Sequence, residues 1–418
     1  MQSPAKIDLY LKTVCRYCDT PLPEPFLELG NSPLANSFLS SNKGVKDEFF
    51  CPLSLTFCQN CTLVQLTHVV PPDLMFSNYL YVSSTTTTFQ KHFADYAKNV
   101  TTRSSGDKKL LAVDIGSNDG LLVSCYQKEG MDALGVEPAK NLSKTANEEG
   151  RLTLNQYFDA ECVDYILKHF RHVDVISANN VFAHIDGSQE FCKNAHRLLS
   201  ETGMLVIEFP YLFTMLSEMF FDMIYHEHLS YISLHALSFL LQKHQLQIFD
   251  VEKVASHGGS LRVFIQKKGG QRLVSKNVIL LMEDEKNKGY QLIQTYKRFA
   301  EKVRQFKLDF ISLIQDLRGE GKSLSGYGAP AKATTIASYC NLTTSDIQYI
   351  VDDNTLKQGK FSPGAHIPVV SSEYLNNHLT NFVIIFAWNF AQEIIRKIEP
   401  LRTKGVKFII PLPHPEIV

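Results

Sequence analysis

The chain has 418 residues, of which 44% are hydrophobic and 20% charged, with 42 lysines and arginines against 43 aspartates and glutamates. This balance leaves no basic surface for nucleic acid or for an anionic membrane. Residues 1–11 lack the apolar stretch of a signal peptide, and no apolar run reaches the ~18 residues that a membrane span needs. We therefore expect a cytoplasmic protein of roughly two to three domains.

Cysteines are concentrated near the N-terminus, where Cys15 and Cys18 form one CxxC pair and Cys58 and Cys61 form another. Each pair can present two thiolates from a tight turn, and four thiolates suit the tetrahedral geometry of Zn²⁺. Such a site has no open coordination position, so we expect a structural zinc rather than a catalytic one. A redox role is a weaker alternative, because it needs only one pair. The zinc would lie in a small β-rich module over residues 1–72.

Apolar, strand-like runs then alternate with helical patterns as far as residue 268. This alternation predicts a mostly parallel, doubly wound sheet with helices on both faces. The expected strands are 110–115, 133–137, 173–178, 204–209, 247–251 and 261–266.

A glycine-containing loop with Gly116, Asn118 and Gly120 follows the first of these strands and precedes a helix. Glycines there allow a tight turn close to a ligand, and the helix N-terminus can face it. Glu137 ends the next strand, where an acid can accept hydrogen bonds from both ribose hydroxyls. The spacing lacks the third glycine of the dinucleotide fingerprint. Taken alone, the loop indicates either a dinucleotide or S-adenosylmethionine (SAM).

The densest cluster of ionisable side chains is Tyr225, His226, Glu227 and His228. Removing a proton from a carbon beside a carbonyl needs a base, which histidine suits, and a hydrogen-bond donor for the enolate oxygen. His184 follows the third expected strand and could reach the same cleft. Two alternatives remain open. The histidines could be structural, or the HxH pattern could lie on a strand and bind a metal with both rings on one face.

A long amphipathic helix is predicted next, ended by Gly319 and Gly321. Its apolar residues recur every three or four positions, which favours a helix packed on a core over a coiled coil. They are Leu292, Tyr296, Phe299, Val303, Phe306, Phe310, Leu313 and Leu317.

A second α/β unit is expected toward the C-terminus, with strands at 323–327, 347–351, 382–387 and 406–410. Gly326, Gly328 and Lys332 mark a strand-to-helix turn, where backbone N–H groups and a positive charge favour a pyrophosphate. Asp352, at the end of the following strand, either contacts a nucleotide or forms a simple turn.

Several of these motifs resemble known families. The loop from Asp114 to Gly120, with Glu137 and the pair Asn179 and Asn180, resembles class I SAM-dependent methyltransferases. The four cysteines, residues 225–231, residues 257–262 and residues 326–332 are together similar to the sugar C-3'-methyltransferase family, over nearly the whole chain and in the same order.

This resemblance implies three domains: a zinc-binding domain (1–72), a SAM-binding class I domain (73–268) and a Rossmann-like domain that holds a nucleotide-sugar (269–418). It implies SAM-dependent methylation at C-3' of a dTDP- or GDP-linked 4-keto-6-deoxysugar through an enolate. We expect a monomer that binds neither nucleic acid nor membrane. The alternative is an NAD(P)-dependent nucleotide-sugar oxidoreductase.

The resemblance also implies roles for individual residues. His228 would be the base, with Tyr225 beside it, Glu227 and His184 completing the polar pocket, and Tyr79 reaching in from the preceding segment. The choice between His228 and Tyr225 as proton acceptor stays open. The implied SAM-binding residues are Asp114, Gly116, Asn118, Gly120, Glu137, Asn179 and Asn180. The implied substrate-binding residues are His257, Gly259, Ser260, Arg262, Tyr327, Gly328, Ala329, Lys332 and Asp352.

Overall fold

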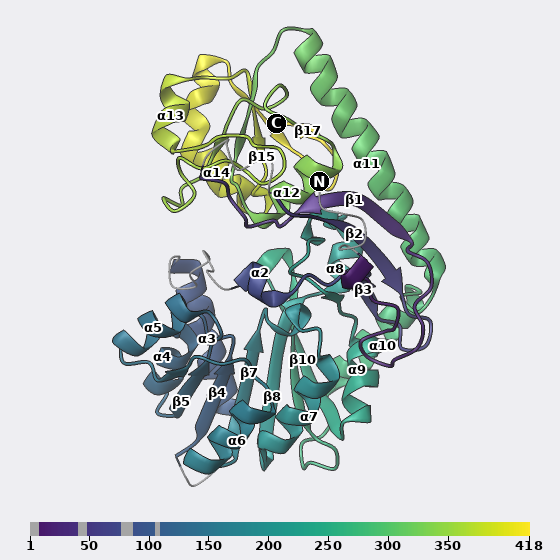
Figure 1. The fold of residues 1–418 in the computed structure, drawn as a ribbon, viewed down its shortest axis with the longest axis vertical. Helices are drawn as coiled ribbons and strands as arrows, with labels where there is room; N and C mark the ends of the chain where they lie inside the picture. The colour runs from purple at the N-terminus through teal and green to yellow at the C-terminus, as the bar shows by residue number, and fades with distance from the viewer. Residues whose placement is uncertain (1–7, 41–47, 77–86, 105–108) are drawn as a thin grey trace.

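The computed structural model describes residues 8–40, 48–76, 87–104 and 109–418. Three β-sheets organise these residues. Figure 1 shows a C-terminal α/β unit at one end of the molecule, a larger α/β unit at the other, and a small N-terminal sheet alongside their junction. The predicted fold class, two doubly wound units with a small N-terminal β module, is confirmed.

The larger unit contains a seven-stranded sheet in the order β10-β11-β8-β7-β4-β5-β6. Its strands β4 to β8 run parallel, and β10 and β11 add an antiparallel edge. Every residue of β4 is buried, as expected of a parallel strand covered by helices on both faces. The strands are β4 (Leu111–Ile115), β5 (Asp132–Val136), β6 (Thr153–Leu154), β7 (Val173–Asn179), β8 (Leu199–Pro210), β10 (Leu246–Val254) and β11 (Ser260–Lys267).

Helices cover both faces of this sheet, because each carries an apolar stripe that must be buried. They are α3 (Thr87–Arg103), α4 (Leu121–Lys128), α5 (Lys140–Glu148), α6 (Ala160–His169), α7 (Ser188–Leu198) and α9 (Leu234–Lys243). The shorter α2 (Pro72–Phe76) and α8 (Leu212–Ser217) lie near the junction with the other parts of the chain.

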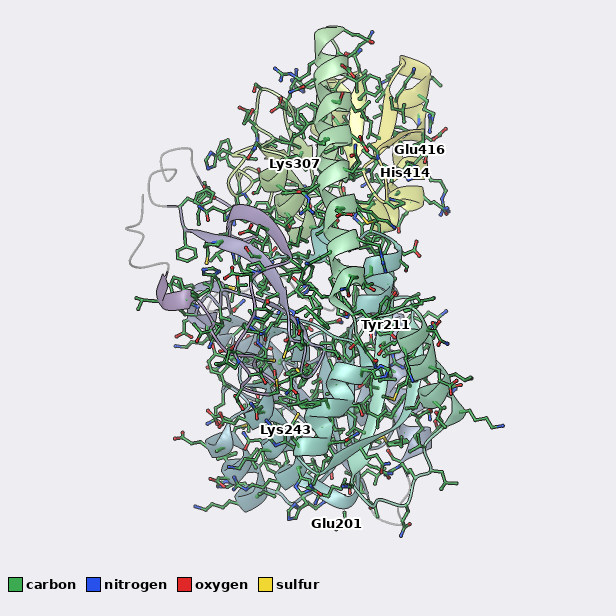
Figure 2. All side chains as sticks on the ribbon, turned by 90° about the vertical axis from the view of Figure 1, so that its right-hand side faces the viewer. Glu201, Tyr211, Lys243, Lys307, His414 and Glu416 are labelled. Carbon is green, nitrogen blue, oxygen red and sulfur yellow. The ribbon has the colours of Figure 1, made fainter. Side chains whose placement is uncertain are left out.

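The carboxyl ends of the parallel strands face the C-terminal unit. Figure 2 shows this for β8, which starts near Glu201 at the far end of the molecule and runs toward Tyr211. His414 and Glu416 of the C-terminal unit lie beyond Tyr211 in the same direction. Ligands of open α/β sheets bind at this carboxyl edge, so the junction is where a site is expected.

The N-terminal sheet has the order β1-β2-β3-β9 and is antiparallel throughout. Three strands come from the beginning of the chain: β1 (Leu27–Pro33), β2 (Phe50–Phe57) and β3 (Val64–Leu66). The fourth, β9 (Ser230–Tyr231), comes from the middle of the chain. β9 lies within the predicted range 73–268 but belongs to the N-terminal sheet, so the sheets do not divide the chain at single points. The three domain boundaries stay predictions.

Two helices connect the units: α10 (Lys276–Asn287) and α11 (Ile293–Gly319). The predicted apolar seam of α11 is buried at Tyr296, Phe299 and Phe310, and Tyr296 stacks on Phe57 of β2 with ring centroids 4.7 Å apart. The helix therefore packs on a core, as predicted. Leu292 lies outside it and is 57% exposed.

The C-terminal sheet has the order β14-β13-β12-β15-β16-β17 and is parallel except at β17. Its elements are β12 (Leu324–Tyr327), α12 (Ala331–Tyr339), β13 (Ile350–Val351), β14 (Val369–Val370), α13 (Ser372–Asn377), β15 (Phe382–Ile385), α14 (Ala391–Ile398), β16 (Lys407–Ile410) and β17 (Glu416–Ile417). The two-residue strands β14 and β17 were not expected, because so few residues show no periodicity.

Within the described residues, no helix is both long and apolar enough to cross a bilayer.

Candidate active site

A cavity of about 690 Å³ lies where the three parts of the chain meet. Its size is typical of a small-molecule site. The seven-stranded unit contributes the ends of β4, β5 and β7, the C-terminal unit contributes the start of α12, and the N-terminal module contributes Asn36 and Phe38. All three parts of the fold therefore take part in one site.

The glycine loop forms one wall of the cavity. Gly116 has φ +64°, and a Cβ there would lie 2.4 Å from Cγ2 of Val181, so only glycine fits. Glu137 is buried at the end of β5 and accepts hydrogen bonds from the backbone N–H of Asn118 and of Ala139, both at 2.8 Å. Burial raises the pKa of this carboxyl above its usual range. The predicted pairing of loop and terminal acid is thus present.

Asn180 marks the same end of the cavity. Its φ is +55°, which is uncommon for a non-glycine residue, and its buried Oδ1 has no hydrogen-bond partner among the described residues. A buried polar atom without a protein partner is able to bond a ligand or a water molecule. Gly116, Asn118, Glu137, Asn179 and Asn180 all line the cavity, which fits a SAM-sized ligand at the loop.

Two predicted SAM-binding residues lie behind this wall rather than in it. Asp114 is fully within β4, and burial raises its pKa well above the usual range. Gly120 is the N-cap of α4 with φ +78°. Neither is among the residues that line the cavity. Their positions shape the loop, and a direct contact with SAM stays a prediction.

Tyr225 and His228 form a hydrogen-bonded pair in the cavity wall. Nδ1 of His228 lies 2.8 Å from the backbone oxygen of Met223, so this nitrogen donates its proton. In the neutral ring, Nε2 is then the basic nitrogen and accepts from the Tyr225 hydroxyl at 2.9 Å. The backbone of the same loop therefore fixes the tautomer that a general base needs.

His226 points away from this pair. Its Nε2 lies 3.2 Å from the backbone oxygen of Cys51 and 3.3 Å from that of Pro52, on β2. Burial lowers the pKa of His226 to about 4. The metal alternative assumed a strand with both rings on one face. It is wrong, because residues 225–228 form a turn that sends the two rings in different directions.

The remaining predicted catalytic side chains are Glu227 and His184. Glu227 accepts a hydrogen bond of 2.5 Å from Nδ2 of Asn36, which belongs to the N-terminal module. His184 ends a short 3₁₀ helix, η4 (Phe182–His184), and packs edge-on against His228 with ring centroids 5.0 Å apart. Both residues line the cavity, while Tyr79 lies outside the described residues.

The opposite end of the cavity is basic. Among the described residues that line it, the two lysines, Lys332 and Lys357, both come from the C-terminal unit. Nζ of Lys332 lies 3.0 Å from Oδ1 of Asn389, and Nζ of Lys357 donates to the backbone oxygen of Ala329 at 2.8 Å. Burial lowers the pKa of both ammonium groups, so a bound anion would stabilise their charged forms.

A buried carboxyl lies behind Lys332. Asp222 accepts a hydrogen bond of 2.5 Å from Nε1 of Trp388, and the Lys332 ammonium stands 3.9 Å from the Trp388 ring centroid. Burial raises the pKa of Asp222 to about 6, although Lys332 and Trp388 act against that rise. This contact joins the C-terminal unit to η5 (Phe221–Met223), the turn that precedes Tyr225.

Other predicted substrate-binding residues do not line the cavity. Arg262 is buried and pairs with Glu208 at 2.8 Å. Burial alone would raise the pKa of Glu208, but His92 and Arg262 hold it at about 2. Asp352 accepts from the backbone N–H of Asn354 at 2.8 Å, which forms a turn, and from that of Ala329 at 2.7 Å, which joins this turn to the end of β12. Gly259, Ser260, Tyr327, Gly328 and Ala329 also lie outside the lining, and the His257 side chain lies outside the described residues.

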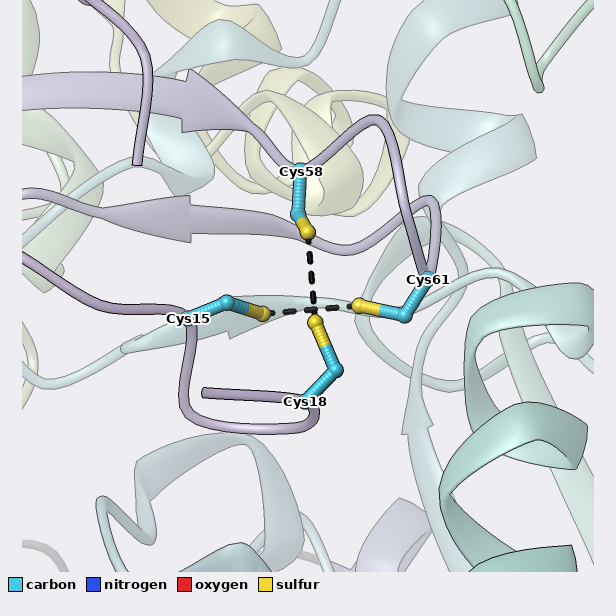
Figure 3. Close-up of side chains that lie close together, drawn as sticks. All are labelled: Cys15, Cys18, Cys58 and Cys61. Carbon is cyan, nitrogen blue, oxygen red and sulfur yellow. Dashed lines mark hydrogen bonds between the residues drawn. The ribbon is translucent and has the colours of Figure 1, made fainter. Parts of the chain in front are cut away.

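The four cysteines form the predicted metal centre (Figure 3). Their sulfurs lie within 4.8 Å of one another, which fits four thiolates around one Zn²⁺ at ~2.3 Å. Hydrogen bonds between the sulfurs raise the pKa of Cys15 and lower that of Cys58, so without a cation the cluster must share protons. Cys15, Cys18, Cys58 and Cys61 are absent from the cavity lining, as expected of a structural zinc.

Sequence reasoning missed Asn36, Phe38, Lys357 and Asn389, which also line the cavity. Lys357 follows the strand end at Asp352 by five residues, which was a usable signal. Asn36 and Phe38 offered none, because nothing in their local pattern shows which face of the N-terminal module meets the other units.

Known proteins resemble this chain over nearly its whole length. Family models match residues 15–76 (zinc binding domain), 89–251 (methyltransferase domain) and 255–413 (C-methyltransferase C-terminal domain). The C-methyltransferase NovU from Streptomyces niveus is 32% identical over 404 residues, covering 97% of this chain and 96% of that one. The matched segments follow the same order as the three parts of the fold.

Solved structures resemble a smaller part. A SAM-dependent methyltransferase from Clostridium acetobutylicum has 15% identity and a TM-score of 0.34, covering 43% of this chain and 92% of that one. Magnesium protoporphyrin IX methyltransferase from Synechocystis has 12% identity and a TM-score of 0.34, covering 43% and 83%.

Proposed function

Because this chain belongs to the sugar C-methyltransferase family, we propose that it transfers the methyl group of SAM to C-3' of a nucleotide-linked 4-keto-6-deoxysugar. The chain is a SAM-dependent methyltransferase with a zinc-binding module, so the oxidoreductase alternative is wrong. We propose the acceptor, the position and the mechanism, and also that the protein acts as a monomer in the cytoplasm.

One observation carries the proposal: a basic histidine nitrogen shares a cavity with the glycine loop at one end and two buried lysines at the other. The loop and Glu137 suit the donor, whose ribose hydroxyls can bond the carboxylate. Lysine ammonium groups bind phosphates as point charges, so Lys332 and Lys357 suit a nucleoside diphosphate.

His228 is the base of the proposed reaction, with Tyr225 next to it. The 4-keto group acidifies the C-3' proton. As the Tyr225 hydroxyl releases Nε2 of His228, the C–H bond breaks, its proton goes to that nitrogen, and its electron pair forms the enolate. When bound, SAM supplies an electrophilic methyl that the enolate carbon takes, leaving the S–C electrons on sulfur. Before the substrate binds, the Tyr225 hydroxyl is hydrogen-bonded to Nε2 and keeps the ring oriented.

Glu227 and His184 complete the polar pocket. The edge-on contact of His184 with His228 limits rotation of the basic ring, and Asn36 holds the Glu227 carboxylate. Positioning of this kind contributes to the rate because the reacting groups need not be ordered during the reaction.

The test is mass spectrometry and NMR of reactions with SAM and a panel of dTDP- and GDP-linked 4-keto-6-deoxysugars. We expect one added methyl group, attached to C-3', for one nucleotide series. The matched control is the same sugar reduced at C-4', which cannot form the enolate and should not react. Methylation of oxygen, or equal turnover of the reduced sugar, would contradict the proposal.

A second measurement isolates the first step. In D₂O with S-adenosylhomocysteine in place of SAM, the protein should exchange the C-3' proton of the keto-sugar for deuterium. Because no methyl group is available under these conditions, the enolate can only return to the keto form. Absence of exchange would contradict the enolate step.

A further inference from the structure

Arg16 lies inside the first cysteine pair, between Cys15 and Cys18, and its side chain is 4% exposed. The guanidinium is shielded from solvent, and within the described part of the chain it donates no hydrogen bond to a cysteine sulfur. Instead, Nη1 donates to the backbone oxygen of Leu229 and to Oγ of Ser230, the latter at 3.3 Å. Leu229 is the residue after His228, so the metal-binding turn bonds directly to the segment that carries the proposed base.

The same side chain also reaches the segment of the second histidine. Nε of Arg16 lies 3.5 Å from Oδ1 of Asp186, two residues after His184. The backbone N–H of Leu229 donates to the oxygen of Ala183 at 2.8 Å, which ties the two segments to each other. One buried arginine therefore contacts both segments whose histidine rings pack 5.0 Å apart.

Other contacts of the N-terminal module hold the same stretch of chain. β9 pairs with β3, and the N–H of Leu66 donates to the Leu229 oxygen at 3.0 Å, the atom that Arg16 also contacts. His226 bonds to β2, as described above. This stretch is thus built into the N-terminal module on several sides, although in sequence it belongs with the seven-stranded unit.

We propose that Arg16 is a positioning residue through which the zinc turn sets the place of His228 and His184. This inference rests on the proposed function only in its claim about catalysis. The metal fixes the turn, the turn fixes Arg16, and Nη1 of its guanidinium holds the Leu229 carbonyl while Nε faces Asp186. Arg16 itself contacts no reacting atom. Lysine keeps the charge but has a single nitrogen, which cannot face both Leu229 and Asp186 as Nη1 and Nε do, so it should replace arginine only in part.

The experiment compares Arg16→Met and Arg16→Lys in the full-length protein. For each variant, zinc content, affinity for S-adenosylhomocysteine, kcat, KM and backbone hydrogen exchange are measured. For Arg16→Met we expect unchanged zinc and cofactor affinity, unchanged KM, faster exchange in residues 226–232 and a kcat about 100-fold lower. Arg16→Lys should fall in between, about 10-fold below the starting protein.

Lys12→Met is the matched control. Lys12 also pairs with Asp186, at 2.5 Å, but its side chain is 38% exposed and contacts Asp186 from outside. It should keep the starting kcat and the starting exchange in residues 226–232. A kcat loss equal to that of Arg16→Met would place the effect at Asp186 and overturn the role of the Leu229 contact.

Two results overturn the proposal: starting kcat in a folded, zinc-loaded Arg16→Met or Arg16→Lys protein, or unchanged exchange in residues 226–232. If Arg16→Met does not fold, Arg16→Lys decides by the same criteria. Hydrogen exchange needs no sugar substrate. If no keto-sugar reacts, the proposed function is contradicted, but hydrogen exchange still tests whether Arg16 holds residues 226–232 in place.

Discussion

The two ends of the cavity differ in charge and in origin. The end built on the seven-stranded sheet carries carboxylates, among them Glu137, Asp159 and Glu190, whereas the end built on the C-terminal unit carries Lys332 and Lys357. A sulfonium cofactor and a nucleoside diphosphate have opposite charges, so each end suits one of them and disfavours the other. Under the proposed function, the seven-stranded unit would select the cofactor and the C-terminal unit the nucleotide.

Removing the proposed base should leave both ends intact and have the largest effect. We expect His228→Asn to lower kcat by about 1,000-fold, because general-base catalysis typically contributes 100- to 10,000-fold. Deuterium exchange at C-3' should fall with it. Isothermal titration should give unchanged affinity for S-adenosylhomocysteine and for dTDP or GDP. Near-normal exchange in the variant would show that His228 is not the base.

Cofactor binding at the acidic end can be weakened without changing the basic end. Glu137→Gln should weaken binding of S-adenosylhomocysteine by about 100-fold, since two hydrogen bonds from ribose hydroxyls to a charged acceptor would be weakened. Binding of the nucleoside diphosphate should not change. Glu148→Gln, on the exposed face of α5, is the control and should bind both ligands normally. Equal weakening of both ligands would mean that the ends are not separate.

Lys357→Met removes one of the two lysines of the basic end. We expect the affinity for dTDP or GDP to fall about 10-fold, because one charge-assisted contact to phosphate is lost, and its salt dependence to become shallower. Affinity for S-adenosylhomocysteine should stay the same. Lys360→Met, on the same loop and outside the cavity lining, is the matched control. An unchanged nucleotide affinity in Lys357→Met would remove this residue from the site.

The smallest expected effect is on the free energy of unfolding and comes from protonation of His226, which lies at neither end of the cavity. The pKa of His226 is about 4 in the folded protein against 6.5 when unfolded, so the unfolded chain binds more protons between these values. Stability is therefore lost as pH falls, by about 1 kcal/mol between pH 7 and 5.5. The raised pKa of Asp222 acts in the opposite direction.

The contribution of His226 to the pH dependence of stability is therefore measured as the difference between the starting protein and His226→Gln. Denaturant unfolding of the starting protein and of His226→Gln is measured at each pH, and Asp222 contributes equally to both. The free energy of unfolding of His226→Gln should fall less on acidification. Parallel profiles for the two proteins would contradict a neutral, buried His226.

The sequence was most informative where function depends on local spacing. The two cysteine pairs, the loop around Gly116 and the acid at Glu137 are each defined within a few residues, and the structure brings each set together. Strands of the large sheet were predictable for the same reason, since continuous apolar runs alternate with helical ones.

Features that depend on contacts between distant segments were not predictable. Asn36 meets Glu227 only because the N-terminal module packs against the turn at residues 225–228, and β9 is too short to be recognised without its partner β3. The HxH alternative failed because it assumed a strand where the chain turns. Nothing in the local sequence pointed to Arg16, because its partner, Leu229, lies 213 residues away.

The pairing of β9 with β3 has a consequence for the order of folding during synthesis. Val64 cannot meet Tyr231 until the ribosome has made and released the intervening chain. Until then the edge of β3 is unpaired, and exposed strand edges are prone to associate with other chains. Early zinc binding at residues 15–61 would hold that edge in a compact form while the rest of the chain emerges. A supply of zinc during translation should therefore affect the yield of native protein more than zinc added afterwards.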